Sequence, residues 1–129
     1  CPPLVGEIDA LIARAKQREY ALVYNKVFPL EDSFDFEGMM AGQQQFKQDA
    51  RGIASRARAA FPAPLLLGAG GCEYCQECAA RRGEPCASPA NAMPSLESYG
   101  IQVSTLASLC GLRYVNGQNT VTYFGGILV

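Results

Sequence analysis

The sequence contains no histidine and no tryptophan. The absence of histidine excludes Ser-His-Asp and Cys-His catalytic arrangements, zinc sites that use imidazole, and iron–sulfur clusters of the Rieske type. A strong charge of either sign is also absent, since 11 Lys and Arg residues offset 12 Asp and Glu residues for a formal net charge of −1. Because no basic field is available to attract phosphates, we expect neither nucleic acid nor an anionic membrane among the partners.

Long apolar runs are missing as well, and none approaches the roughly 20 residues that a membrane-spanning helix needs. A length of 129 residues and a hydrophobic share of 49% suit one domain, over residues 1–129, with an ordinary core. No export signal is recognisable, and clustered cysteines fit a reducing compartment, so we expect a cytoplasmic protein. No acid–base pair or substrate motif is recognisable, which favours a non-catalytic accessory protein and leaves catalysis open.

What the chain does contain is a run of cysteines with the spacing Cys-x2-Cys-x2-Cys-x7-Cys, formed by Cys72, Cys75, Cys78 and Cys86. Short gaps let the backbone curl around a small inorganic core, and the spacing is close to the bacterial ferredoxin pattern Cys-x2-Cys-x2-Cys-x3-Cys-Pro. We therefore predict that these four thiolates bind a [4Fe–4S] cluster. The cysteine loop, residues 68–89, is the centre of the functional hypothesis.

Two other interpretations of the cysteines stay open. A structural zinc site usually takes its ligands as two separated pairs, so three equal gaps suit zinc less well. A disulfide framework is allowed by the even count of six cysteines, but cysteines two residues apart close loops that are too small to constrain the unfolded chain. Metal binding is therefore preferred over disulfide bonding.

Residues around the run have predicted roles of their own. Gly70 and Gly71 let the backbone pass close to inorganic sulfide and aim N–H groups at it, although a tight turn after a strand would explain them equally. Cys1, in Cys1-Pro2-Pro3, competes with Cys86 as a ligand or belongs to a second site with ligands outside this chain. Cys110 ends an apolar helical segment, where a cysteine is expected to be a small buried hydrophobe.

Hydrophobic periodicity indicates an α/β fold. It predicts helices over about 4–19 and 42–60, a buried strand over 20–28 and a short buried strand over 65–67. Strand, helix and strand in this order favour parallel pairing with a right-handed crossover. The cysteine loop would then leave the carboxyl end of the second strand, where sites in α/β sheets commonly lie.

The other segments are predicted from turn and capping signals. Residues 31–38 are acidic but lack the closing Glu of a calcium loop, so we expect a solvated loop. A short helix over 102–110 and a hairpin turning at Asn116-Gly117 complete the chain. The whole is predicted to be a single compact domain with a small mixed sheet of three to five strands, packed helices and the cysteine loop after the second strand.

Several pieces of the chain together resemble a known family. They are Cys1-Pro2-Pro3, Gly71-Cys72-x2-Cys75-x2-Cys78, Gly83-x-Pro85-Cys86-x2-Pro89, Ser95-Leu96-Glu97-Ser98-Tyr99-Gly100-Ile101 and Val121-Thr122-Tyr123-Phe124. The combination resembles the prokaryotic predicted metal-binding proteins catalogued as domain of unknown function 2284. The resemblance implies metal binding through cysteines but no known reaction. It also implies that an N-terminal segment with further cysteines precedes this chain.

The functional hypothesis has two forms. In the first, one cysteine-ligated [4Fe–4S] cluster passes one electron to or from a partner protein, with Arg81 and Arg82 as candidate docking charges. In the second, a zinc or iron–sulfur site only stabilises the cysteine loop of an interaction module and has no redox role. The oligomeric state is not indicated by the sequence.

Overall fold

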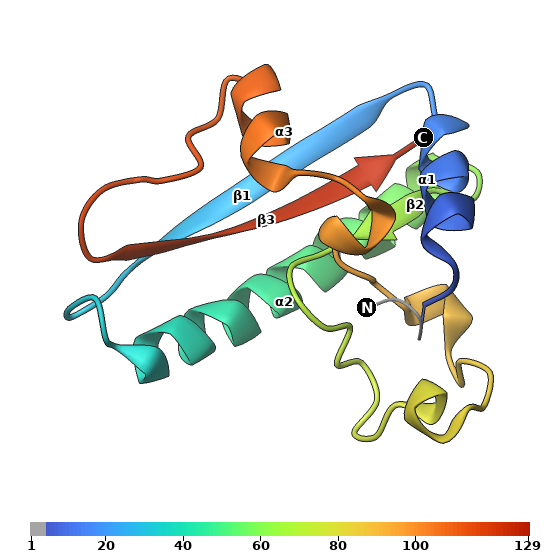
Figure 1. The fold of residues 1–129 in the computed structure, drawn as a ribbon, viewed down its shortest axis with the longest axis horizontal. Coiled ribbons are helices and arrows are strands. Elements are labelled where there is room, and N and C mark those ends of the chain that lie inside the picture. Colours follow the sequence, from blue (N-terminus) through green and yellow to red (C-terminus); the bar gives the residue numbers. More distant parts are fainter. Residues whose placement is uncertain (1–4) are drawn as a thin grey trace.

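Strand β3 (Thr120–Leu128) is the middle strand of a three-stranded sheet in the computed structural model, which describes residues 5–129 (Figure 1). The strand order is β1-β3-β2, and both outer strands pair with β3 in antiparallel register. The remaining elements are α1 (Ile8–Lys16), β1 (Ala21–Pro29), α2 (Phe36–Ala60), β2 (Leu65–Leu67), α3 (Val103–Leu109) and the 3₁₀ turns η1 (Ala79–Arg82), η2 (Pro89–Asn91) and η3 (Glu97–Tyr99). The predicted α/β class, with a small sheet and packed helices, is confirmed.

The predicted pairing of the first two strands is wrong. β1 and β2 run in the same direction, but β3 lies between them, so the helical crossover does not join neighbouring strands. All pairing between the named strands is antiparallel, and the described parallel bridge, Gly68 with Ser95, lies outside them. A distant C-terminal segment supplies the middle strand, and the local order of elements carries no signal of that insertion.

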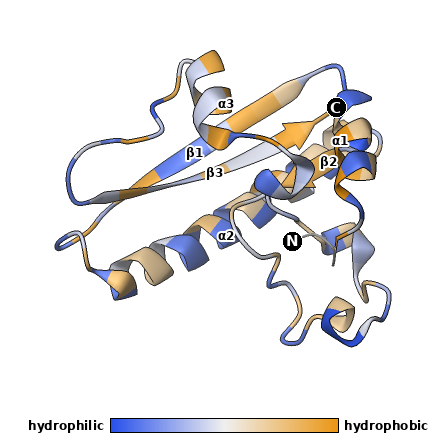
Figure 2. Ribbon diagram, in the orientation of Figure 1, coloured by the Kyte–Doolittle hydropathy of each residue, from blue (hydrophilic) through white to orange (hydrophobic). Residues whose placement is uncertain are grey.

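Both faces of the sheet are covered, and the alternation of side chains along the strands explains how. Leu65 and Leu67 of β2, with Phe124 of β3, pack on the side of α1, η3 and α3. Leu66 and Ile127 point the other way and pack against α2. A period of two along β2 and β3 therefore builds two cores, and Figure 2 shows apolar residues gathered where these strands meet.

β1 is an edge strand and is half exposed along its length, so its predicted burial is wrong. The predicted hairpin is also wrong, because residues 112–119 form no strand and β3 is continuous from Thr120 to Leu128. Gly125 lies inside β3, where a Cβ atom would come within 2.5 Å of the Tyr24 ring. A residue with a side chain would therefore collide with this ring, and the strand passes the glycine without a break.

Helix α2 begins at Phe36, well ahead of the predicted start near residue 42. The Asp35 carboxylate caps it by accepting a hydrogen bond from the Gly38 N–H at 2.8 Å, and it accepts another from the Glu31 N–H at 3.1 Å. These bonds lower the pKa of Asp35. The segment predicted as a solvated loop therefore contains the helix cap, which is a recognised role of Asp.

Helix α1 is shorter than predicted, because it spans Ile8–Lys16 within the expected 4–19, and residue 4 lies outside the described residues. The short helix predicted over 102–110 is present as α3 and is followed by Gly111 with a φ of 70°. None of the helices within residues 5–129 is long and apolar enough to cross a membrane.

Candidate metal-binding loop

The cysteine loop leaves the carboxyl end of β2, as predicted. Its base is closed by backbone hydrogen bonds, in which the Gly68 N–H donates to the Pro94 carbonyl at 2.9 Å and the Leu96 N–H donates to the Gly68 carbonyl at 3.2 Å. From this base the chain projects away from the sheet before it returns through η2 (Figure 1). The fold thus fixes the two ends of the loop and leaves its middle outside the core.

The loop buries very little apolar surface of its own. Between residues 69 and 92 the only buried side chain is Ala79, which is 7% exposed. Regular structure is limited to the short turns η1 and η2, and hydropathy is mixed along the segment (Figure 2). Because fixing each backbone residue costs about 1–2 kcal/mol of conformational entropy, hydrophobic burial within the loop is too small to order it.

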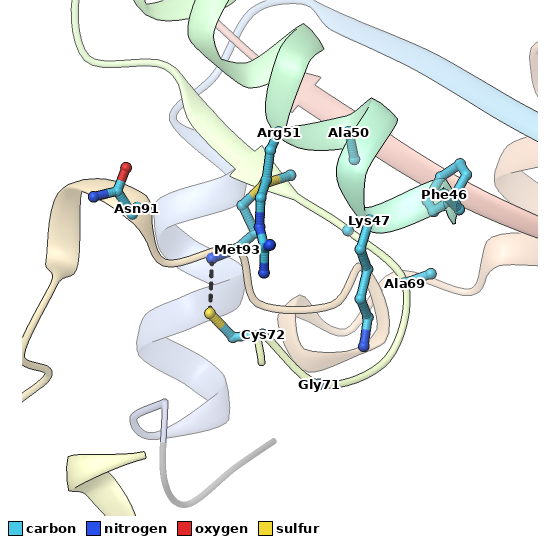
Figure 3. A pocket seen from close by; sticks show the side chains of 10 residues that line it. Phe46, Lys47, Ala50, Arg51, Ala69, Gly71, Cys72, Asn91 and Met93 are labelled. Atoms are coloured by element: carbon cyan, nitrogen blue, oxygen red, sulfur yellow. Dashed lines mark hydrogen bonds between the residues drawn. The ribbon is translucent and has the colours of Figure 1, made fainter. Parts of the chain in front are cut away.

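The four candidate cysteines lie along this segment as free thiols. Cys72 is half-buried and its Sγ accepts a hydrogen bond from the Met93 N–H at 3.4 Å (Figure 3). Cys75 is also half-buried, whereas Cys78, at the start of η1, and Cys86 are exposed. Two of the four thiols are therefore half-buried and two are exposed to solvent.

The thiols are close in sequence but are not assembled around one point. Within residues 5–129, no group of three His, Cys, Asp or Glu side chains is placed to hold a metal ion. The donor set itself fits a thiophilic metal, because four thiols and no imidazole are the ligands of iron–sulfur clusters and of all-cysteine zinc sites. Binding would require the exposed part of the loop to close around the metal, and the assignment of ligands stays a prediction.

Helix α2 holds the first part of the loop with cationic side chains. Lys47, whose side chain is only 11% exposed, forms an ion pair with the Glu73 carboxylate. The Arg51 guanidinium donates to the Glu73 carbonyl at 3.1 Å and lies 5.4 Å from the centre of the Tyr74 ring. Figure 3 shows Lys47 and Arg51 extending from α2 toward the chain around Gly71 and Cys72.

The predictions from the sequence do not include these contacts. A signal was available in the sequence: Lys47, Arg51 and Arg58 are four and seven residues apart, which places them on one stripe of a helix. A stripe of one charge sign indicates a partner, but the sequence does not say which segment provides it. In the structure Glu73 is the partner of Lys47 and Arg51, through its carboxylate and its backbone carbonyl respectively.

The backbone conformation of this segment agrees with part of what was predicted for Gly70 and Gly71. Gly70 has a φ of 65°, and a Cβ atom there would lie 2.9 Å from Nε2 of Gln43, so a side chain would be strained and crowded. Glu73 also has a positive φ of 46°, which is uncommon for a residue with a side chain. Gly71 takes no such conformation, so its predicted contact with a cluster rests on its lack of a side chain.

Four further predicted residues have different outcomes. Cys110 is exposed at the end of α3, so its predicted burial is wrong; the helix ends at Leu109 with that turn facing solvent. The guanidinium of Arg82 pairs with Glu77 and Glu84, each at 3.0 Å, and these bonds raise its pKa, whereas Arg81 is exposed. Cys1 lies outside the described residues.

Comparison with known proteins gives one positive result. No curated protein and no solved structure matches the chain. The family model described as "Predicted metal-binding protein (DUF2284)" matches residues 1–129. Since the match extends over the full sequence, the chain belongs to this family of predicted metal-binding proteins.

Proposed function

We propose that the protein carries a [4Fe–4S] cluster ligated by Cys72, Cys75, Cys78 and Cys86. The observation that carries this proposal is that four free thiols with ferredoxin-like spacing occupy a long segment that is closed by backbone hydrogen bonds at its base and buries almost no apolar surface of its own. Membership of a family of predicted metal-binding proteins supports the metal, and the equal two-residue gaps favour the cluster over zinc.

The metal would stabilise a loop that apolar burial stabilises very little. Its middle buries a single side chain, so ligation would supply free energy that fixes it, as in small metalloproteins whose folding is coupled to metal binding. Cys72 is already tied to Met93, and Lys47 and Arg51 hold the following residue. Ligation would therefore begin from an anchored end, with the exposed part from Cys78 to Cys86 closing last.

Electron exchange with a partner protein is the role we propose for the cluster. Cys78 and Cys86 are exposed, so a partner could approach this end of the loop closely. Arg81 is exposed beside them and is the better candidate for docking, because the charge of Arg82 is offset by two carboxylates. Thiolate-bound iron–sulfur chemistry also suits a reducing compartment, so we propose a cytoplasmic location.

A structural metal site is the second candidate. It is favoured by the same absence of apolar burial within the loop, because a zinc ion bound by four cysteines would order the segment without any electron transfer. In that case the exposed loop would serve as an interaction surface.

Metal analysis of protein purified without oxygen separates the two. Iron, acid-labile sulfide and zinc should be counted per chain, and absorption and electron paramagnetic resonance spectra recorded before and after reduction with dithionite. About four irons and four sulfides, with a visible absorption band that bleaches on reduction, is the expected result. About one zinc without sulfide would refute the cluster and leave the structural site, and protein that binds neither metal would refute both.

A further inference from the structure

A hollow of about 180 Å³ lies between the second half of α2 and the segments that begin and end the projecting chain. Its lining includes Arg51, Ser55, Arg58, Tyr74, Asn91 and Met93. The volume is sufficient for several water molecules or for one small ligand. It adjoins the small cleft in which Cys72 lies, because Arg51, Asn91 and Met93 line both spaces, but Cys72 itself is not part of its lining.

The hollow is lined by two arginines whose charge is not offset by a carboxylate. Arg51 and Arg58 are seven residues apart, so they share one face of α2 with about 10 Å of helix axis between them. Among residues 5–129 neither guanidinium forms an ion pair, since the Glu73 carboxylate is taken by Lys47 and Arg51 reaches only the Glu73 carbonyl. Two permanent positive charges therefore border one concave site in a protein of net charge −1.

The other lining groups suit a small polar ligand. Ser55 contributes a hydroxyl group and Asn91 an amide, while buried Met93 forms an apolar wall. Asn91 is held in place by donating from Nδ2 to the Ser88 hydroxyl at 2.9 Å, and Arg51 is held against the Tyr74 ring. Arg51 and Asn91 are thus oriented before any ligand arrives, which lowers the entropic cost of binding.

We propose that this hollow binds a small molecule that carries a phosphate or carboxylate group, with Arg51 and Arg58 as its ionic contacts. A guanidinium presents paired N–H donors that match the oxygens of either group. A polyanion is not the expected ligand, because the chain as a whole has a net charge of −1 and so has no excess of positive charge to hold a row of phosphates. The proposal does not depend on which metal the cysteines bind.

The test is calorimetric titration of the full chain, purified without oxygen, with inorganic phosphate, with succinate and with chloride at matched ionic strength. Matching is needed because a general charge effect responds to ionic strength alone. Saturable binding of phosphate or of succinate, tighter than that of chloride, is the expected result. Tighter phosphate binding assigns a phosphate-bearing ligand, and tighter succinate binding assigns a carboxylate. Binding no tighter than that of chloride overturns the proposal.

Variants of α2 provide the matched control. Arg58→Gln should weaken binding about tenfold, the loss expected when one charge-assisted hydrogen bond is removed. Arg56→Gln removes the same charge from the same helix at an exposed position that does not line the hollow, and it should leave affinity unchanged. Equal weakening in both variants would overturn the site. Metal content should be measured on the same samples. It tests the proposed metal function separately, so that failure of the anion site and failure of the metal site can be told apart.

Discussion

Replacing Cys78 with serine should remove the metal while leaving the folded core in place. The thiol is exposed at the start of η1, and in the proposed site it supplies the third of the closely spaced ligands. Serine preserves the size of the side chain and removes the soft thiolate that iron and zinc require. We expect Cys78→Ser to lose most of its bound metal and the middle of the cysteine loop to become disordered.

The cost to the core can be worked out from what the loop buries. Between residues 69 and 92 only Ala79 is buried, and removing one methyl-sized group from the interior costs about 0.8 kcal/mol. For a chain of this length, such a change lowers the melting temperature by about 3 °C. The contact of Lys47 with Glu73 adds little, because the carboxylate is largely exposed to solvent.

The assay combines metal analysis, thermal unfolding followed by circular dichroism, and limited proteolysis. Cys110→Ser is the matched control, since Cys110 is also an exposed thiol but lies outside the loop. The control should keep its metal, and Cys78→Ser should be cleaved within the loop while its helical signal persists. Equal metal loss in both variants would refute the ligand assignment. Loss of the helical signal in Cys78→Ser alone would refute the separation of loop and core.

Phe46→Ala should lower the free energy of unfolding by about 3–5 kcal/mol in urea titrations, because Phe46 is 1% exposed and fills the core between α2 and the sheet. A loss below about 1 kcal/mol would contradict this packing. The hydrogen bonds that cap α2 lower the pKa of Asp35, so the stability that its carboxylate contributes is fully present above the ordinary carboxyl pKa and is lost as the pH falls through the lowered pKa. Asp35→Ala should therefore be less stable than the wild-type protein at neutral pH. Its free energy of unfolding should also fall less than that of the wild-type protein on acidification. Burial raises the pKa of Tyr24 from 10.0 to about 12, so the free energy of unfolding should fall as the pH rises through that interval. An ultraviolet titration that shows ionisation of Tyr24 near pH 10 in the folded protein would contradict the burial of this side chain.

Short sequence patterns correctly predicted those helices and strands that are determined by residues adjacent in the chain. Three consecutive leucines after Pro64 indicated a short buried strand, and the structure has β2 at these residues, leading into the cysteine loop. The spacing of the cysteines could likewise be seen without a structure. Pro62 ended the long helix close to where α2 ends at Ala60. In each case the signal and the element occupy the same few residues.

What could not be predicted depends on residues far apart in the chain. The Asn116-Gly117 dipeptide comes directly before a turn at residues 118–119, and Gly117 has a φ of 110°, but the chain passes from that turn into β3 without forming a hairpin. β3 instead pairs along its full length with β1, which begins almost a hundred residues earlier. This pairing is decided by how much apolar surface the strands bury between the two helical layers, which can be evaluated only once the whole fold is known. For the same reason, the sequence does not show which segment contacts the cationic residues of α2.

The place of β3 in the sheet has a consequence for how the chain folds during synthesis. β3 follows every other described element in the sequence, yet it is the strand that both β1 and β2 require. Until β3 leaves the ribosome, the apolar surfaces of α2 and β2 have no complete sheet to pack against, and exposed apolar surfaces of this kind are prone to aggregation. Because pairing between distant segments is slow, the core should close only after translation has passed residue 128. The cysteines emerge much earlier, so they would be open to capture by metal-delivery factors or to oxidation before the protein around them has folded.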